Sequence, residues 1–250
     1  MLNTFFTQIA MKGKIITIEG LDGSGKSTQI DLLTNRLSES GVKHKFIHFP
    51  VLNKGVYGKL IAEYLRGELG SLKHVHPKLV ALLFAEDRNE HKAQLNEWLN
   101  DGYLIIMDRY VNSNIAFQCA KTENQLDKIE LKKWILDFEF NHNALPTPDV
   151  SFFLNVPFSH IEKSLNSSRT GADREYLNGK TDIHEDSLEL QRNVYNEYLT
   201  LLEEQSNFYE IGCFGEGASW LSPSDIHNAI FDRIQLFNQS ISGNDKVLLK

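Results

Sequence analysis

Hydrophobic residues fall into two alternating patterns along the chain. Short apolar runs rich in β-branched and aromatic residues lie at 14–19, 45–49, 103–107, 150–156 and 207–211. Between these runs, apolar residues recur at three- and four-residue spacing, as at Ile30, Leu33 and Leu37, which is the period of an amphipathic helix. Apolar strands that alternate with helices are typical of a parallel sheet covered on both faces. The pattern predicts one α/β domain with about five parallel strands flanked by helices.

The two ends of the chain depart from this pattern. Residues 1–11 precede the first strand and are expected to form an N-terminal extension, which leaves the domain at 12–240. The last helix is expected to open at 222–225, where serine and aspartate supply capping side chains. Residues 241–250 are then expected to form a polar tail.

One internal stretch has no regular apolar period. Residues 166–184, NSSRTGADREYLNGKTDIH, are polar and partly basic, although they lie between two predicted helices. A long irregular insertion in a compact domain is either disordered or a loop that acts as a lid. The residues alone leave both alternatives open.

Composition narrows the class of protein. Of the 250 residues, 41% are hydrophobic and 24% charged, which is typical of a globular domain, and charges interrupt every apolar segment before it is long enough to cross a bilayer. The two cysteines, Cys119 and Cys213, form neither a disulfide framework nor a closely spaced metal site, which favours the cytoplasm. The net charge of -7 argues against nucleic acid as the main partner. We expect neither a nucleic-acid nor a membrane partner.

Residues 20–28, GLDGSGKST, carry the strongest chemical signal. They match the P-loop pattern G-x-x-x-x-G-K-S/T and lie between an apolar strand and an amphipathic helix. Glycines let consecutive backbone N–H groups curl around phosphate oxygens, and the start of the helix adds its positive end. Lys26 supplies a charge that can follow a transferred phosphoryl group, and the Ser27 hydroxyl is placed to bind Mg²⁺. The segment predicts a nucleotide-phosphate site rather than a glycine turn that matches by chance.

A second candidate motif, DRYVNSNIAFQ, occupies residues 108–118. Asp108 follows a predicted parallel strand, and ligands bind at the carboxyl ends of such strands in open α/β sheets. Asp108 is a candidate for the water shell of a metal ion, and Arg109 for neutralising charge between donor and acceptor phosphates. The alternative is that this pair simply caps the following helix.

Together these motifs resemble the thymidylate kinase family, the dTMP kinase branch of the P-loop nucleoside monophosphate kinases. The resemblance spans about 14–236 and rests on EGLDGSGKSTQ at 19–29, FP at 49–50, LLFAEDR at 82–88, DRY with Ser113 and Phe117-Gln118, and LPTPD at 145–149. It implies a three-layer P-loop NTPase fold with a lid, ATP and Mg²⁺ as cofactors, dTMP as the acceptor and a homodimer. The helix expected at 79–99 is one candidate for the dimer contact.

The resemblance also implies roles for individual residues. The ATP phosphates fall to Gly20, Leu21, Asp22, Gly23, Ser24, Gly25, Lys26, Ser27 and Thr28, and Mg²⁺ to Ser27 and Asp108. The dTMP site falls to Asp22, Phe49, Pro50, Phe84, Arg88, Arg109, Ser113, Asn114, Phe117 and Gln118. The catalytic residues would be Lys26, Asp108, Arg109, and Arg169 or Arg174 of the lid.

Within the dTMP site, the resemblance gives each side chain a task. Phe84 stacks on the thymine ring, and Arg88 bonds its exocyclic oxygen. Phe117 lies under the sugar, and Asp22 accepts a hydrogen bond from the 3′-hydroxyl. Gly23 leaves the loop without a catalytic cation of its own, which directs attention to the lid arginines, unless the lid is only a flexible polar loop.

One departure from the family concerns the acceptor phosphate. Many members carry an arginine a few residues after Phe-Pro, whereas this chain has FPVLNKGVYGKL. Lys54 or Lys59 is a candidate substitute, or Arg109 takes more of that task.

Three alternatives remain open. The chain is another P-loop deoxynucleoside or nucleoside monophosphate kinase, a nucleotide-binding switch that needs a partner, or an inactive relative. A deoxynucleoside kinase needs a carboxylate base, for which Glu19 is the obvious candidate.

Overall fold

The computed structural model describes residues 13–52, 54–72, 74–165, 176–178, 180–185, 187–215 and 219–245. Five parallel strands form one sheet in the order β2-β3-β1-β4-β5. They are β1 (Lys14–Glu19), β2 (His44–His48), β3 (Leu104–Asp108), β4 (Val150–Asn155) and β5 (Phe208–Gly212). Each strand lies within one residue of its predicted range, so the predicted α/β class and parallel sheet are confirmed.

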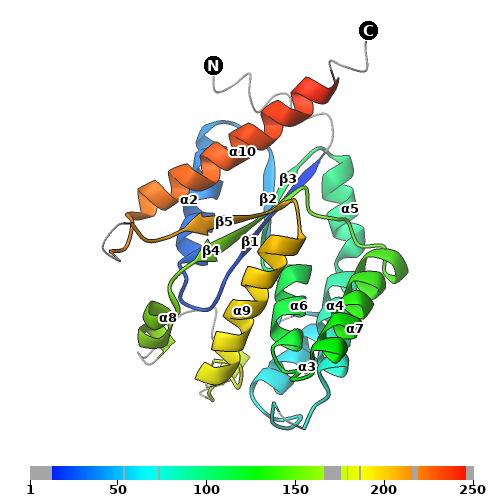
Figure 1. Cartoon of the computed structure of the whole chain (residues 1–250). Helices are drawn as coiled ribbons and strands as arrows, with labels where there is room; N and C mark the ends of the chain where they lie inside the picture. The colour runs from blue at the N-terminus through cyan, green and yellow to red at the C-terminus, as the bar shows by residue number, and fades with distance from the viewer. Residues whose placement is uncertain are drawn as a thin grey trace.

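Helices cover both faces of the sheet (Figure 1). They are α2 (Lys26–Glu39), α3 (Gly55–Leu65), α4 (Pro77–Glu90), α5 (Lys92–Asn100), α6 (Val111–Cys119), α7 (Gln125–Leu136), the π-helix η2 (Asp137–His142), α8 (Phe158–Leu165), α9 (Leu188–Glu204) and α10 (Pro223–Asp245). Helices α2 and α10 pack on one face, and α5, α6 and α9 on the other, with α4 and α7 outside α6. None of the helices in the described ranges combines the length and the apolar surface that spanning a membrane requires.

The central strands are buried because both faces of the sheet are covered. Every residue of β3 is buried, as are five of the six residues of β1. The parallel register pairs Ile18 with Asp108, so the two strands end side by side. The loop that follows Glu19 and the side chain of Asp108 therefore meet at one edge of the sheet, as expected for ligand sites in such folds.

The helix expected over 79–99 is two helices. Helix α4 ends at Glu90 and α5 begins at Lys92, since the His91 N–H bonds the Arg88 carbonyl at 3.1 Å and its ring Nδ1 lies 2.9 Å from the Asp87 carbonyl. The prediction of one continuous helix was wrong because the apolar period continues across this break.

The last helix opens at the predicted cap and runs further than expected. The Asp225 N–H donates to Ser222 Oγ at 3.1 Å, which caps α10 as the sequence predicts. The helix continues to Asp245, five residues into the segment 241–250 that was expected to be a polar tail. The predicted extension at 1–11 lies outside the described residues.

Candidate active site

The loop after β1 has the backbone of a phosphate cradle. Gly23 and Gly25 have φ of 81° and 87°, which side chains with a Cβ rarely adopt, and a Cβ at Gly20 would lie 2.7 Å from Ser24 Oγ. Lys26 opens α2 and folds back, donating to the carbonyls of Gly20 at 3.1 Å and Leu21 at 2.9 Å. The start of the 14-residue helix α2 therefore faces the hollow of the loop.

A cavity of about 810 Å³ lies against this loop, and we call it the loop cavity. Its loop-side lining is Asp22, Gly23, Gly25, Lys26, Ser27 and Thr28, and its far side includes His48, Lys54, Asp108 and Arg109. Three residues predicted for the phosphate site do not line it: Gly20 and Ser24 pack on each other, and the Leu21 side chain belongs to the core. Their contribution is the shape of the loop.

Asp108 lies at the end of β3 and remains ionised. It does not cap α6, because the N-cap of that helix is Tyr110 and no side chain caps it. Burial raises the pKa of Asp108, but the hydrogen bond from His48 Nδ1 at 3.1 Å and the charge of Lys26 outweigh it and hold the pKa below its usual range. Its Oδ1 is buried without a hydrogen-bond partner in the described part of the chain. The carboxylate therefore has one oxygen available for a cation.

Arg109 joins the loop to α6. Its backbone has φ 65°, in the left-handed region that a residue with a side chain adopts at a cost of about 1–3 kcal/mol. The guanidinium bonds Asp22 Oδ1 at 2.8 Å and Ser113 Oγ at 3.2 Å, and its charged carbon lies 5.2 Å from the centre of the Phe117 ring. Burial lowers the pKa of Arg109, but Asp22 and nearby groups raise it further, so the cation persists.

A second hollow of about 130 Å³, the inner cavity, adjoins the loop cavity. The ten residues predicted for the acceptor nucleotide all line it: Asp22, Phe49, Pro50, Phe84, Arg88, Arg109, Ser113, Asn114, Phe117 and Gln118. Six residues line both cavities: Asp22, His48, Pro50, Leu52, Arg109 and Tyr176. The two hollows therefore meet at the Asp22–Arg109 ion pair.

The polar end of the inner cavity is organised by Glu139. This residue of η2 is fully buried and accepts hydrogen bonds from Arg88 Nε at 2.6 Å and Asn114 Nδ2 at 2.8 Å. Arg88 is itself 2% exposed, so it is not the solvated surface charge that its place in a helix allows. Asn114 Oδ1 is buried with no partner in the described ranges. Glu139 thus holds two cavity side chains by their inner atoms.

Ser113 belongs to a different network. Its hydroxyl donates to Glu19 Oε2 and lies 2.7 Å from the Tyr198 hydroxyl. Glu19 also accepts from the Tyr110 N–H at 2.9 Å. Burial raises the pKa of Glu19 above its usual value, and these hydrogen bonds offset only part of that increase. Ser113 therefore lines the inner cavity, but its hydroxyl is already bonded to Glu19 and Tyr198.

The described C-terminal part of the expected lid, with Glu185 just after it, lines the inner cavity. Tyr176, Asp182, His184 and Glu185 line it. The His184 ring stacks on Phe117 with centroids 5.2 Å apart, and the Tyr176 hydroxyl donates to Asp182 at 2.6 Å. Arg169 and Arg174, the predicted lid cations, lie outside the described residues.

Several cavity residues escaped the sequence analysis. His48 on β2 bonds Asp108 on the neighbouring strand β3, Glu139 holds Arg88 from a π-helix 51 residues further on, and His184 comes from the end of the expected lid. Nothing in the local sequence DFEFNH indicates that Glu139 is buried and holds an arginine of another helix. Only the fold brings these side chains to the cavity.

The loop cavity lies on a phosphate loop and the inner cavity between aromatic walls, and the two share an aspartate and an arginine. This arrangement suits the transfer of a phosphoryl group between two bound molecules. The chain is a P-loop phosphotransferase. The model of the family described as Thymidylate kinase matches residues 18–213. The chain belongs to the thymidylate kinase family.

Individual relatives agree. The thymidylate kinase of Plasmodium falciparum is 32% identical over 187 residues, which cover 75% of this chain and 76% of the relative. The human enzyme is 32% identical over 154 residues, covering 62% and 66%. The solved thymidylate kinase of Candida albicans, described as having broad substrate specificity, superposes with a TM-score of 0.66 at 27% identity over 90% of this chain and 92% of that one. These likenesses also bear out the P-loop NTPase fold that the sequence resemblance implied.

Proposed function

We propose that the chain transfers the terminal phosphoryl group of ATP to dTMP, giving ADP and dTDP for dTTP synthesis. The observation that carries the proposal is the junction of the loop cavity and the inner cavity at Asp22 and Arg109. A donor phosphate in one cavity and an acceptor phosphate in the other would meet beside a persistent cation. Such positioning and charge neutralisation account for most of the catalysis of phosphoryl transfer.

The residues of the loop cavity fit Mg²⁺. The ion favours one or two carboxylates together with phosphate oxygens of the substrate, rather than a cage of protein ligands. The ionised Asp108 has an unpaired buried oxygen, and no group of three or more His, Cys, Asp or Glu side chains forms a metal cluster in the described part of the chain. Ser27 and Asp108 would hold the ion, which when bound neutralises charge on the donor phosphates.

The lining of the inner cavity supports the proposal that the acceptor carries a uracil-type base such as thymine. Arg88 is a donor that suits a base carbonyl, and the unpaired Asn114 Oδ1 suits an adjacent ring N–H. Cytosine has no ring N–H at that position and carries an amino group in place of the carbonyl. Phe84 and Phe117 supply flat apolar surfaces for the base and the sugar.

The deoxynucleoside-kinase alternative receives no support from Glu19. This carboxylate is 0% exposed, accepts hydrogen bonds from Tyr110, Ser113 and Tyr198, and lines neither the loop cavity nor the inner cavity. A general base must reach the hydroxyl whose proton it takes.

An acceptor screen tests the proposal. With ATP and Mg²⁺, we expect the highest kcat/KM for dTMP among dTMP, dUMP, UMP, CMP and thymidine, with UMP disfavoured by Phe117 under the sugar. Preference for CMP or thymidine would overturn it. ATP hydrolysis at one rate with and without dTMP would favour a nucleotide-binding switch instead.

Lys54 is our candidate for the missing arginine at the acceptor phosphate. It lines the loop cavity with Asp22 and Arg109, whereas Lys59 lines neither cavity. Lys54→Met is expected to raise KM for dTMP about tenfold, as loss of one charged contact does. Lys59→Met is the matched control and should leave both Michaelis constants unchanged. Equal kinetics for the two variants would remove Lys54 from the site.

The lid is proposed to supply the catalytic cation. Gly23 places no charge in the loop, and Arg174 lies two residues before Tyr176, which lines both cavities. Arg169→Ala or Arg174→Ala is expected to lower kcat about 10²-fold, as loss of a positioned cation does. Lys180→Ala removes a lid charge that is paired with Glu68 and is the control. Near-normal turnover in both arginine variants would show that the lid has no such role.

We further propose a homodimer through α4 and α7, which pack on each other. Leu79 of α4 and Leu126 and Ile129 of α7 are 59%, 70% and 48% exposed, so these two neighbouring helices present three large apolar side chains that a partner could cover. A solution mass of one chain in light scattering would contradict this.

A cytoplasmic location also remains a proposal, supported by two buried free thiols, Cys119 and Cys213.

A further inference from the structure

Lys121, just beyond α6, lies where three segments meet. Its ammonium contacts the Tyr64 hydroxyl of α3 at 3.0 Å, Gln118 Oε1 of α6 at 2.9 Å and His184 Nε2 at 2.9 Å. All three atoms belong to side chains without a carboxylate, so this is not an ion pair. The arrangement uses every proton that an ammonium can donate.

These contacts fix the orientation of two side chains of the inner cavity. An ammonium only donates, so Gln118 must present its carbonyl oxygen and His184 an unprotonated Nε2. Burial, and then the charge of Lys121, lower the pKa of His184 well below its usual range, which keeps the ring neutral with its proton on Nδ1. Gln118 Nε2 and His184 Nδ1 have no hydrogen-bond partner in the described ranges, while both residues line the inner cavity. Two N–H donors are therefore available there.

The segment that carries His184 is anchored to α3 by independent contacts. The Ile183 N–H bonds the Leu65 carbonyl at 2.9 Å, and Arg66 Nη1 bonds the Tyr176 carbonyl at 2.8 Å. Tyr176 and Ile183 also pack on the apolar cluster of Ile61, Tyr64, Leu65 and Val80. The backbone of this segment thus has its own support, and Lys121 acts on the His184 ring.

We propose that Lys121 is a positioning residue of the inner cavity, which holds Gln118 and His184 so that their free N–H groups face oxygen atoms of the bound acceptor nucleoside. The inference rests on the proposed dTMP kinase function and adds a residue that does not itself line the inner cavity. Lys121 lines instead a hollow on the other side, between α4 and α7.

The charge of Lys121 also makes this contact depend on pH. Burial lowers the pKa of Lys121 to about 7, although Asp182 raises it, and burial raises the pKa of Asp182 to about 6. The groups that face Lys121 are Tyr64, Asp182 and His184 on one side, and His76, Lys78, Asp127 and Glu130 around the outer hollow. As pH rises through about 7, the ammonium loses a proton and keeps only two donors for three acceptors.

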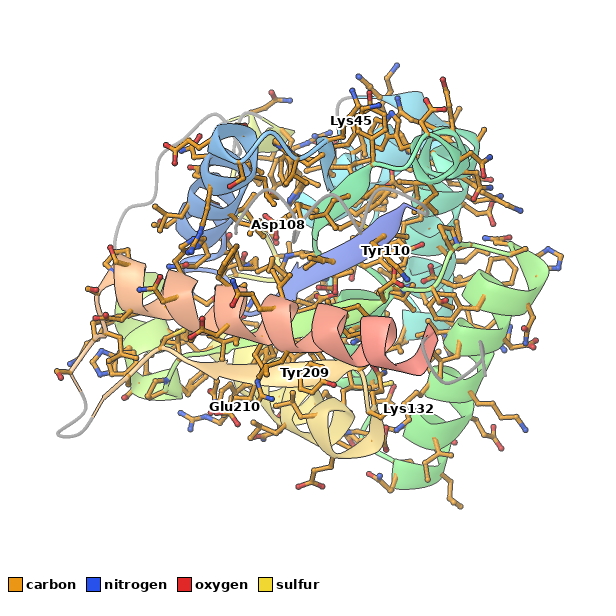
Figure 2. All side chains as sticks on the ribbon, turned by 90° about the horizontal axis from the view of Figure 1, so that it is seen from above. Lys45, Asp108, Tyr110, Lys132, Tyr209 and Glu210 are labelled. Atoms are coloured by element: carbon orange, nitrogen blue, oxygen red, sulfur yellow. The ribbon has the colours of Figure 1, made fainter. Side chains whose placement is uncertain are left out.

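Steady-state kinetics of the full chain with ATP and dTMP test this proposal. Lys121→Met is expected to raise KM for dTMP about tenfold, with KM for ATP unchanged, because the hydrogen bonds of two cavity side chains are loosened. Lys121→Arg keeps the donors and should recover most of the affinity. Lys132→Met is the matched control: its ammonium pairs with Glu204, and Figure 2 shows Lys132 well away from Asp108.

The pH profile separates positioning from folding. KM for dTMP should rise above pH ~7 in the unmodified protein and stay flat in Lys121→Arg, whose guanidinium does not titrate. Kinetics of Lys121→Met equal to those of Lys132→Met would overturn the inference, as would equal increases in KM for both substrates. If the unmodified protein phosphorylates no dTMP at all, the proposed function fails, and the result is distinct from either of these.

Discussion

Lys26→Met is expected to lower kcat about 10³-fold, a loss of about 4 kcal/mol of transition-state stabilisation. In the structure Lys26 is 7% exposed, and its ammonium donates to the carbonyls of Gly20 and Leu21 in the loop. It therefore lies at the loop, where we propose that its charge stabilises the negative charge that develops during transfer. Methionine keeps most of the side-chain volume and removes the charge.

The affinity for ATP should change less than kcat. The backbone N–H groups of the loop and the start of α2 remain in the variant, and they are the groups proposed to hold the ground-state phosphates. We expect Kd for ATP, measured by calorimetry, to rise no more than about tenfold. Lys128→Met is the control, because it removes a lysine of α7 that pairs with Glu197 of α9. A kcat within tenfold of the unmodified protein would mean that Lys26 has no special role in the transition state.

The fold was predictable because its signal is local. Each strand of the sheet is a continuous apolar run, and the P-loop combines a strand, glycines and a helix within 26 residues of sequence, 14–39. Asp108 was found for the same reason, since its position after a strand places it at the ligand edge. The break at His91 was missed because side chain and backbone end a helix there without a glycine or a proline.

The inner cavity was predictable only in part. The residues that the motif resemblance implies for the acceptor all line one hollow, but the resemblance does not show which of their polar atoms are already bonded within the protein. Glu139, Lys121 and His48 determine which atoms of Arg88, His184 and Asp108 are free, and each of these pairs is far apart in sequence. Such contacts depend on where the fold places two segments, which no local pattern encodes. What each side chain can donate or accept therefore required the structure.

The Arg88–Glu139 pair joins a residue found from a motif to one that only the fold reveals. Breaking this pair is expected to be the costliest change to the free energy of unfolding. Arg88→Met leaves the Glu139 carboxylate buried without its cation, and Glu139→Met leaves the guanidinium buried without its anion. Breaking a buried pair from one side typically costs about 3–5 kcal/mol of the free energy of unfolding. We expect each single variant to lose that amount in urea titrations.

The double variant separates stability from recognition. Two apolar side chains of similar volume remove both buried charges, so Arg88→Met combined with Glu139→Met should recover most of the lost free energy of unfolding, giving a large coupling in the double-mutant cycle. Affinity for dTMP should not recover, because the donor proposed for the base carbonyl is absent and Asn114 Nδ2 keeps only the Ala81 carbonyl of its two acceptors. KM for dTMP should stay about 10²-fold above that of the unmodified protein, with KM for ATP unchanged. A double variant as unstable as either single one would show that the two charges do not compensate each other, and recovery of the dTMP affinity would show that Arg88 does not contact the base.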